Sequence, residues 1–161
     1  MKLSPNFSLA EMTHSQTAAR EGIDNTPKPE HLENLKRLCV ELLEPIRSML
    51  GNRPITVSSG YRSPQLNAAV NGSNSSAHSI GFAVDFNCHS FGNVKTVATF
   101  LAHELPKRGI KFDQLILEFY DPKTGTGWIH LGMYNRQMQQ RGQILTFRRI
   151  GGKTDIQKGI I

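Results

Sequence analysis

The segment SAHSIGFAVDFN, residues 76–87, predicts a turn that runs directly into a half-buried strand. Apolar and polar residues alternate through its second half, which is the period of a strand with one face toward a core. On this pattern Asp85 points to the face opposite the core. Gly81 permits a tight bend before the strand, and the bend can bring the side chains of His78 and Asp85 to a common point.

A second segment, Trp128–Met133, predicts another strand, and by alternation it carries Trp128 and His130 on one face. Together with His78 and Asp85, His130 would make a set of two imidazoles and one carboxylate, which is typical of catalytic zinc sites that leave a fourth position for water. Each residue also has a structural explanation, as a histidine within a strand or as one half of an ion pair. The spacing alone leaves both interpretations open.

Outward from these segments, helical patterns come first and strand patterns mostly later, which indicates the α+β class with N-terminal helices packed on a mainly antiparallel sheet. One small helix is expected within residues 4–24, and further helices from Pro29 to about Ile46, from 64 to 70 and from 94 to 105. Pro45 is expected to kink or shorten the end of the helix that begins at Pro29. Strands are expected at residues 54–58, 82–87, 114–120, 128–133 and 143–149.

The length of 161 residues suits a single domain, 1–161, with a helical part over about 1–50 and a catalytic sheet part over about 51–150. With 38% apolar and 20% charged residues, the composition is that of a globular protein rather than a disordered one. No apolar run approaches the roughly 18 residues of a spanning helix, so we expect no stable membrane insertion. The N-terminus lacks the apolar run of a signal peptide, and we expect synthesis in the cytoplasm.

The net charge of +6 favours acidic partners. The basic residues are scattered apart from Arg148-Arg149, and no nucleic-acid-reading motif accompanies them, so nucleic acid is not an expected partner. Two cysteines are too few for a disulfide scaffold, and Cys39 is predicted to be a buried thiol on the apolar face of a helix.

Four separated motifs follow one another along the chain: SGYRS at 59–63, LN at 66–67, SxHxxGxAxD at 76–85 and WxH at 128–130. Taken in order, they resemble the peptidase M15 family. That family comprises zinc D-Ala-D-Ala carboxypeptidases and related peptidoglycan endopeptidases, including several phage endolysins, and it shares the fold class of the hedgehog signalling domain. The resemblance runs from about Asn6 to Phe147, and FSLxE at 7–11 and DNxP at 24–27 resemble the phage-type branch.

The resemblance implies that His78, Asp85 and His130 bind one zinc ion per chain. It places Arg62 opposite the scissile carbonyl, where a guanidinium can stabilise the developing oxyanion or hold a substrate carboxylate. A surface ion pair is the structural alternative for Arg62. Ser76 matches a serine beside the first ligand and is expected to bind substrate.

The general base departs from the family pattern. Many members carry an acidic residue three positions before the last histidine ligand, but here that position is Gly127. Glu118 is the best substitute, because a carboxylate on the partner strand of the hairpin can face the same groove as His130. Asp113 and Asp121 are alternatives, although both resemble turn residues.

The remaining histidines have simpler explanations. His14, His31 and His103 fall on predicted helices without ligand partners, and solvent exposure accounts for them. His89 lies close enough to Asp85 in sequence to be a rim or substrate residue.

These observations favour a zinc metallopeptidase that hydrolyses peptidoglycan stem peptides, at either the D-Ala-D-Ala or the L-Ala-D-Glu bond. A monomeric, phage-type endolysin delivered to the wall by another factor fits the phage-type motifs. The alternative is a non-catalytic, zinc-containing wall-binding module of the same fold. A position of Glu118 far from the metal would favour this alternative. A basic nucleic-acid-binding protein is a third possibility and predicts salt-sensitive affinity for DNA that does not depend on zinc.

Overall fold

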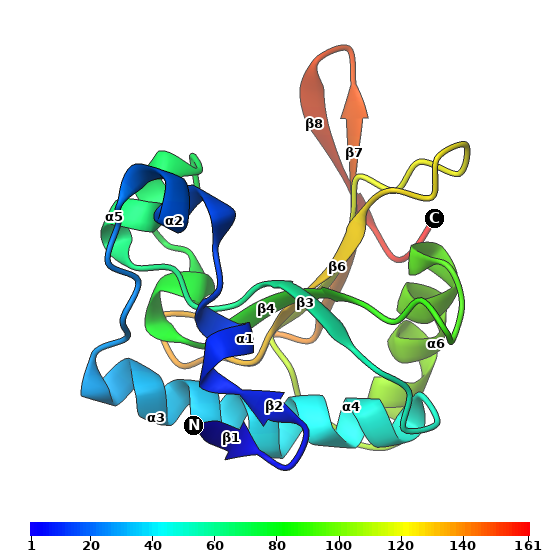
Figure 1. The fold of residues 1–161 in the computed structure, drawn as a ribbon. Helices are drawn as coiled ribbons and strands as arrows, with labels where there is room; N and C mark the ends of the chain where they lie inside the picture. The colour runs from blue at the N-terminus through cyan, green and yellow to red at the C-terminus, as the bar shows by residue number, and fades with distance from the viewer.

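The computed structural model describes residues 1–161 and combines α-helices with one large sheet (Figure 1). The helices are α1 (Leu9–Thr13), α2 (Gln16–Glu21), α3 (Pro29–Leu38), the π-helical turn η1 (Cys39–Leu43), α4 (Glu44–Met49), α5 (Pro64–Ala69), the 3-10 turn η2 (Ala77–Ile80) and α6 (Val94–Lys107). The strands are β1 (Lys2–Ser4), β2 (Phe7–Ser8), β3 (Thr56–Ser59), β4 (Ala83–Asn87), β5 (Gln114–Glu118), β6 (Trp128–Gly132), β7 (Gln143–Ile150) and β8 (Lys153–Lys158). None of the helices has the length and apolar composition needed to cross a bilayer.

The large sheet has six strands in the order β3-β4-β6-β5-β7-β8. Every neighbouring pair is antiparallel except β5 and β7, which confirms the expected α+β class with a mainly antiparallel sheet. The strand β8 was not predicted, because its residues are mostly polar and exposed and lack an apolar alternation. With β7 it forms a hairpin that projects away from the rest of the sheet (Figure 1).

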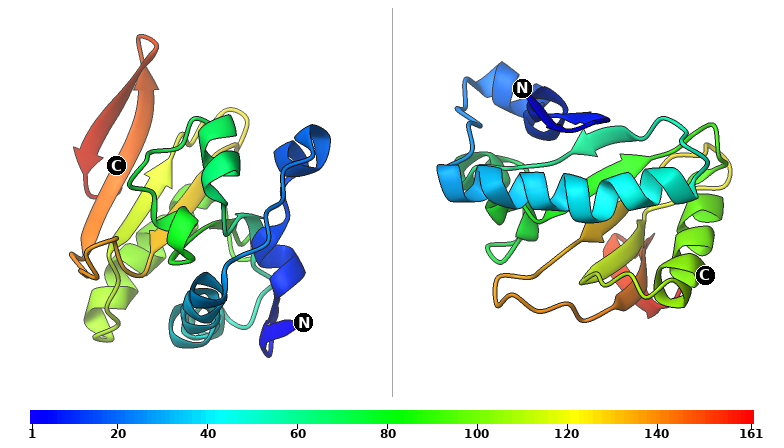
Figure 2. Two further views of the ribbon diagram at one scale, coloured as in Figure 1. Left: turned by 90° about the vertical axis from the view of Figure 1, so that its left-hand side faces the viewer. Right: turned by 90° about the horizontal axis from the view of Figure 1, so that it is seen from below.

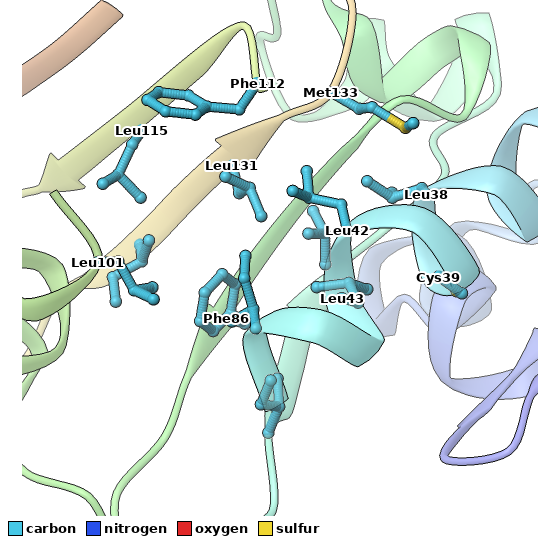
Figure 3. Packing of buried hydrophobic residues seen from close by; sticks show 14 of the residues in the cluster. Leu38, Cys39, Leu42, Leu43, Phe86, Leu101, Phe112, Leu115, Leu131 and Met133 are labelled. Carbon is cyan, nitrogen blue, oxygen red and sulfur yellow. The ribbon is translucent and has the colours of Figure 1, made fainter. Parts of the chain in front are cut away.

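Helices cover one face of the sheet and bury the core against it. The continuous rod formed by α3, η1 and α4 runs along the molecule, with α6 at a steep angle to it (Figure 2). Apolar side chains of the helices and of the central strands meet in one cluster. Figure 3 shows part of it, with Leu38, Leu42 and Leu43 from the rod, Leu101 from α6, and Phe86, Leu115 and Leu131 from the strands. The other face of the central strands stays free of this packing.

The rod differs from the expected helix in how it accommodates Pro45. The helix continues to Met49, and the turn just before the proline widens into η1, where the N–H of Glu44 donates to the carbonyl of Cys39. A proline inside an α-helix removes one hydrogen bond and clashes with the carbonyl four residues earlier. The π-helical turn changes that hydrogen-bond pattern locally, so the helix passes the proline without ending. Cys39 is buried there, as expected, and burial raises the pKa of its thiol to about 12.

The N-terminal arm, residues 1–25, was expected to hold one small helix and instead holds a short hairpin followed by two helices. Ser8 caps α1 and Ser15 caps α2, each accepting a hydrogen bond from a backbone N–H of the first turn. Gly22 ends α2 in the left-handed conformation. The two serine caps divide the stretch into separate helices, a boundary that the apolar pattern alone does not show.

The bend before β4 depends on Gly81, as predicted. Its φ angle is +84°, and a β-carbon built there would lie 2.6 Å from the carbonyl oxygen of His31 in α3. The bend therefore packs directly on the helix, and it ends η2 immediately before the chain enters β4. A side chain at this position would be strained in conformation and would also force α3 and the bend apart.

We predict that Gly81→Ala destabilises the protein more than Gly109→Ala. Gly109 has a similar φ of +67° but no atom within 4 Å of the added β-carbon, so it isolates the conformational cost of about 1–2 kcal/mol. The clash at Gly81 adds about 1–3 kcal/mol more. Urea unfolding of the two variants measures the difference, and equal losses of stability would show that α3 yields freely at the bend.

Candidate metal centre

The uncovered face of the sheet brings together the three predicted ligands from two strands and one turn. Asp85 in β4 and His130 in β6 are direct cross-strand partners. His78 lies in η2 and is carried toward them by the bend at Gly81. One ligand atom from each residue lies within 4.8 Å of the other two. The structure therefore places all three side chains in one cluster that is suited to a metal ion.

The distances within the cluster are short. The Nδ1 atom of His130 lies 2.9 Å from Oδ1 of Asp85, and Nε2 of His78 lies 3.3 Å from the same oxygen. The two imidazole rings meet edge to face with their centroids 5.1 Å apart. His78 is buried, and the side chains of Asp85 and His130 are each 13% exposed.

The tautomer of His78 follows from its other hydrogen bond. Its Nδ1 lies 2.7 Å from the carbonyl oxygen of Gly60, and because a carbonyl only accepts, Nδ1 must carry the hydrogen. Burial lowers the pKa of His78, so the ring is neutral and Nε2 presents a lone pair. That lone pair faces the Asp85 carboxylate, and two electron-rich atoms in this position are stabilised by a cation between them.

The charges of Asp85 and His130 are coupled. Burial opposes ionisation of Asp85, yet the facing imidazoles of His78 and His130 hold the pKa of this carboxyl well below its usual range. Burial also opposes protonation of His130, but the hydrogen bond and the charge of Asp85 raise the pKa of the imidazole. The carboxylate is thus a permanent negative charge at the centre of the cluster.

The donor set fits zinc. Four ligands at about 2.0–2.2 Å in a tetrahedron lie roughly 3.4 Å from one another, and the His78 Nε2 to Asp85 Oδ1 distance is 3.3 Å. The Nδ1–H of His78 donates to a backbone carbonyl, which is the usual way that a protein orients a metal-binding imidazole. No cysteine belongs to the cluster, so it lacks the thiolates of most structural zinc sites.

Glu118 extends the cluster on the same face. It pairs across the strands with Trp128, two residues before His130, and its Oε1 lies 4.0 Å from Nδ1 of His130. Its side chain is 17% exposed. Burial, together with the nearby charge of Asp85, raises the pKa of Glu118 to about 7. An acid beside the metal ligands whose pKa is near neutrality is suited to accept and return protons.

The geometry at Gly127 explains why no acid stands there. Its φ angle is +120°, and an added β-carbon would lie 2.8 Å from the α-carbon of Tyr120 and 2.9 Å from the carbonyl oxygen of Glu118. The loop between β5 and β6 folds back so closely that only glycine fits. In this backbone, Glu118 is the carboxylate that reaches the cluster.

Arg62 lies beside the cluster, with its backbone N–H donating to the carbonyl of His78 at 3.1 Å. Its Nε is buried and has no hydrogen-bond partner, and the side chain forms no ion pair. The surface ion pair considered from the sequence is therefore wrong. Burial lowers the pKa of Arg62, against the attraction of Asp85 and Glu118.

A groove of about 520 Å³ leads away from the cluster, and both Arg62 and Asp85 line it. Its floor is β3, and one wall is α5. The other wall is the link between α1 and α2 with the start of α2, including the exposed His14. Solvent exposure was the expected explanation for His14, and its place at the groove was missed because no sequence motif joins it to the ligands.

The other candidates lie in structural roles. The hydroxyl oxygen of Ser76 accepts the backbone N–H of His78 and so caps η2. Asp113 is buried and forms a bidentate ion pair with Arg141. Asp121 accepts a hydrogen bond from the backbone N–H of Lys123 in a turn. Neither alternative base therefore belongs to the cluster. His89 and His103 are exposed, whereas His31 is half-buried with its Nδ1 3.3 Å from the Tyr61 hydroxyl.

We predict that the purified protein holds one zinc ion per chain and that His78→Ala or Asp85→Ala loses most of it. Each substitution removes one of three protein ligands, and Asp85→Ala also removes the negative charge. Elemental analysis after dialysis measures the metal content. His103→Ala, an exposed histidine outside the cluster, is the matched control, and a wild-type chain that binds no zinc when supplied with it would contradict the assignment.

In the metal-free protein, we predict that Glu118→Gln becomes increasingly stabilising as the pH rises. The folded chain raises the pKa of Glu118 from 4.5 to about 7. The wild-type protein therefore keeps its full free energy of unfolding below about pH 4.5, where the Glu118 carboxyl is protonated, and loses part of it as the pH rises through 7. The variant avoids this loss because glutamine stays neutral at every pH. The gain should be on the order of 3 kcal/mol. Urea unfolding with a chelator measures it, and a difference that does not change with pH would argue against a buried Glu118.

Comparison with known proteins agrees with this geometry. A family model described as Peptidase M15 matches residues 5–115, more than two thirds of the chain, and no curated protein matches the sequence. The matched region contains Arg62, His78 and Asp85. Glu118 and His130 lie beyond it, and their place in the cluster rests on the pairing of β6 with β4 and of β5 with β6. The chain belongs to the peptidase M15 family.

Proposed function

We propose that this chain is a zinc metallopeptidase that hydrolyses peptide bonds in the stem peptides of bacterial peptidoglycan. The observation that carries the proposal is a largely buried glutamate beside a cluster of two imidazoles and one carboxylate, with Oε1 of Glu118 4.0 Å from Nδ1 of His130. A metal-binding cluster alone would serve a structural site equally well. The added acid, the unpaired Arg62 and the groove lined by Arg62 and Asp85 are what a hydrolase needs.

His78, Asp85 and His130 would hold the zinc ion. When bound there, zinc supplies Lewis acidity, which polarises a carbonyl group and lowers the pKa of water. The hydrogen bond from His78 to Gly60 keeps one imidazole in the tautomer that metal binding requires. Asp85 provides negative charge to balance the cation.

Glu118 and Arg62 would share the remaining chemistry. The carboxylate of Glu118 takes a proton from the attacking water and passes it to the nitrogen of the leaving amine, for which a pKa near neutrality is suited. The guanidinium of Arg62, unpaired and partly buried, donates to the oxygen of the scissile carbonyl as negative charge develops on it. Ser76 lies next to the first ligand and would contact substrate in addition to capping η2.

The substrate follows from the family. The bond cut would be D-Ala-D-Ala, in a carboxypeptidase, or L-Ala-D-Glu, in an endopeptidase. The groove beside Arg62 fits a peptide that carries a carboxylate, because its lining includes this cation and Asp85 is its only acidic residue. We further propose a fold of the hedgehog and DD-peptidase type and a role as a monomeric phage-type endolysin that acts on the wall after release or delivery.

The alternative function is a wall-binding module that keeps the metal without catalysis. Gly127 favours it, because the acid common in the family is missing there. Glu118 opposes it, because a buried carboxylate next to the ligands costs stability that simple binding does not require. The position of Glu118 makes the peptidase the stronger proposal.

We predict that the zinc-loaded protein cleaves purified peptidoglycan and that Glu118→Gln lowers turnover by at least about a hundredfold while keeping its zinc. Mass analysis of the products identifies the bond: loss of a terminal alanine indicates a carboxypeptidase, and a new amino group on D-Glu indicates an endopeptidase. Glu21→Gln, an exposed glutamate on α2, is the control for removing a carboxylate. Absence of any product with zinc present would favour the binding module, and near-normal turnover of Glu118→Gln would remove Glu118 from its role.

A further inference from the structure

Asn25, at the end of the N-terminal arm, joins two segments that are far apart in sequence. Its Nδ2 lies 2.9 Å from the carbonyl oxygen of Thr13 and 3.0 Å from that of Tyr61. Its Oδ1 lies 2.8 Å from the backbone nitrogen of Ser63. One half-buried side chain therefore connects the end of α1 to the strap of residues 60–63 that leads into α5.

The orientation of this amide is fixed by the chemistry of its partners. Carbonyl oxygens only accept and a backbone N–H only donates, so the NH₂ end of Asn25 must face Thr13 and Tyr61, and its oxygen must face Ser63. Both amide hydrogens and the oxygen are used. Aspartate has the same shape but no donor, and in its place it would set a carboxylate oxygen against two carbonyl oxygens.

The two strap residues held by Asn25 lie on either side of Arg62. The backbone N–H of Arg62 donates to the carbonyl of His78 at 3.1 Å, and Nδ1 of His78 donates back to the carbonyl of Gly60. The strap is thus fixed to the metal-binding turn on one side and to the arm through Asn25 on the other. The guanidinium itself has no ion pair and its Nε has no partner, so the backbone is what positions it.

The arm also approaches the strap directly. The N–H of Tyr61 donates to the carbonyl of Met12 at 2.7 Å, and a β-carbon at Gly60 would lie 2.3 Å from the same oxygen. Gly60 therefore permits close contact between the end of α1 and the strap. Asn25 adds three hydrogen bonds beside this contact, next to the link that forms a wall of the groove.

We propose that Asn25 is a positioning residue for Arg62 and that, through Asn25, the N-terminal arm helps to form the peptidase site. Through Asn25 the arm holds the backbone on both sides of Arg62 and so sets the direction of the guanidinium into the groove. The catalytic part of this inference rests on the proposed function. The structural part, that Arg62 depends on Asn25, can be tested without any substrate.

The test without substrate uses the NMR signal of the Arg62 Nε–H, assigned by its loss in Arg62→Lys. In the wild-type protein the buried Nε–H should exchange slowly with water, and in Asn25→Ala and Asn25→Asp its exchange should accelerate by at least about tenfold, because local opening of the strap exposes it. Metal content, measured alongside, should remain at the wild-type level.

Glu44→Ala is the matched control. Glu44 also anchors the arm with three hydrogen bonds, accepted from the Ser4 hydroxyl and from the backbone and side chain of Asn6, but at the far end of the arm. Its loss should lower the melting temperature without changing the exchange of the Arg62 Nε–H. Equal acceleration in Glu44→Ala, or none in either Asn25 variant, would overturn the inference.

The catalytic consequence is tested by a double-mutant cycle on peptidoglycan. Asn25→Ala should lower kcat by about 10- to 100-fold, since small displacements of a catalytic group carry large rate penalties. In an Arg62→Ala background the same change should cost less than about twofold, because the group that Asn25 positions is gone. Additive losses would show that Asn25 acts by some route other than Arg62. If the wild type cleaves nothing while Asn25→Ala still frees the Arg62 Nε–H, the proposed function fails and the positioning role stands.

Discussion

The opposite directions of successive side chains along β4, β5 and β6 are the constraint on which the rest of the structure depends. One face of these strands packs against α3, α4 and α6, and that burial sets their register. A slip of one residue would turn Asp85 and His130 into the core and Phe86 and Leu131 out of it. The apolar face therefore determines, through geometry alone, that Asp85 and His130 meet on the other face. Core packing and site assembly are two consequences of the same pairing.

The uncovered face concentrates groups that are unfavourable without a partner. Three such groups lie close together there: a carboxylate with a strongly lowered pKa, a neutral imidazole whose lone pair is directed at it, and a second acid whose pKa is raised to about 7. Buried polar groups left without partners cost free energy, and a bound cation offsets that cost. The unpartnered Nε of Arg62 belongs to the same pattern. Buried ionisable side chains without partners lower the free energy of unfolding, and side chains with perturbed pKa values concentrate at functional sites.

Around the site, the main chain packs closely against neighbouring main chain at three glycines. Glycines at 60, 81 and 127 each lie where a β-carbon would meet a neighbouring backbone atom at less than 3 Å. The first lets the N-terminal arm contact the strap that carries Arg62. The second packs the metal-binding turn on α3, and the third folds the loop between β5 and β6 back on itself. Three close main-chain contacts thus fix the backbone around the site.

Local patterns in the sequence were sufficient for the class of fold, and together with the family resemblance they selected the three residues of the metal cluster. The alternation from Phe82 to Asn87 and the WxH segment placed Asp85 and His130 on the face away from the core, and the structure pairs them directly. The family resemblance added Arg62, and the hairpin pattern selected Glu118. The strand predictions succeeded because strand alternation is a local property that acts at every residue. The strand β8 escaped detection because Ile156 is its one apolar residue, which leaves no alternation to recognise, and the strand is held in the sheet by pairing with β7.

Features that depend on contacts between distant segments were decided by the tertiary structure alone. That His78 is held in one tautomer by Gly60, that His14 lines the groove and that Asn25 spans the strap on both sides of Arg62 cannot be read from spacing. The same holds for the pKa of Glu118, since desolvation is set by everything that surrounds the carboxyl. The sequence by itself determined which residues are the candidates for the chemistry, because residue type and period are local. Their protonation, orientation and support come from the folded chain, because hydrogen bonds and burial join residues that are separated by tens of positions.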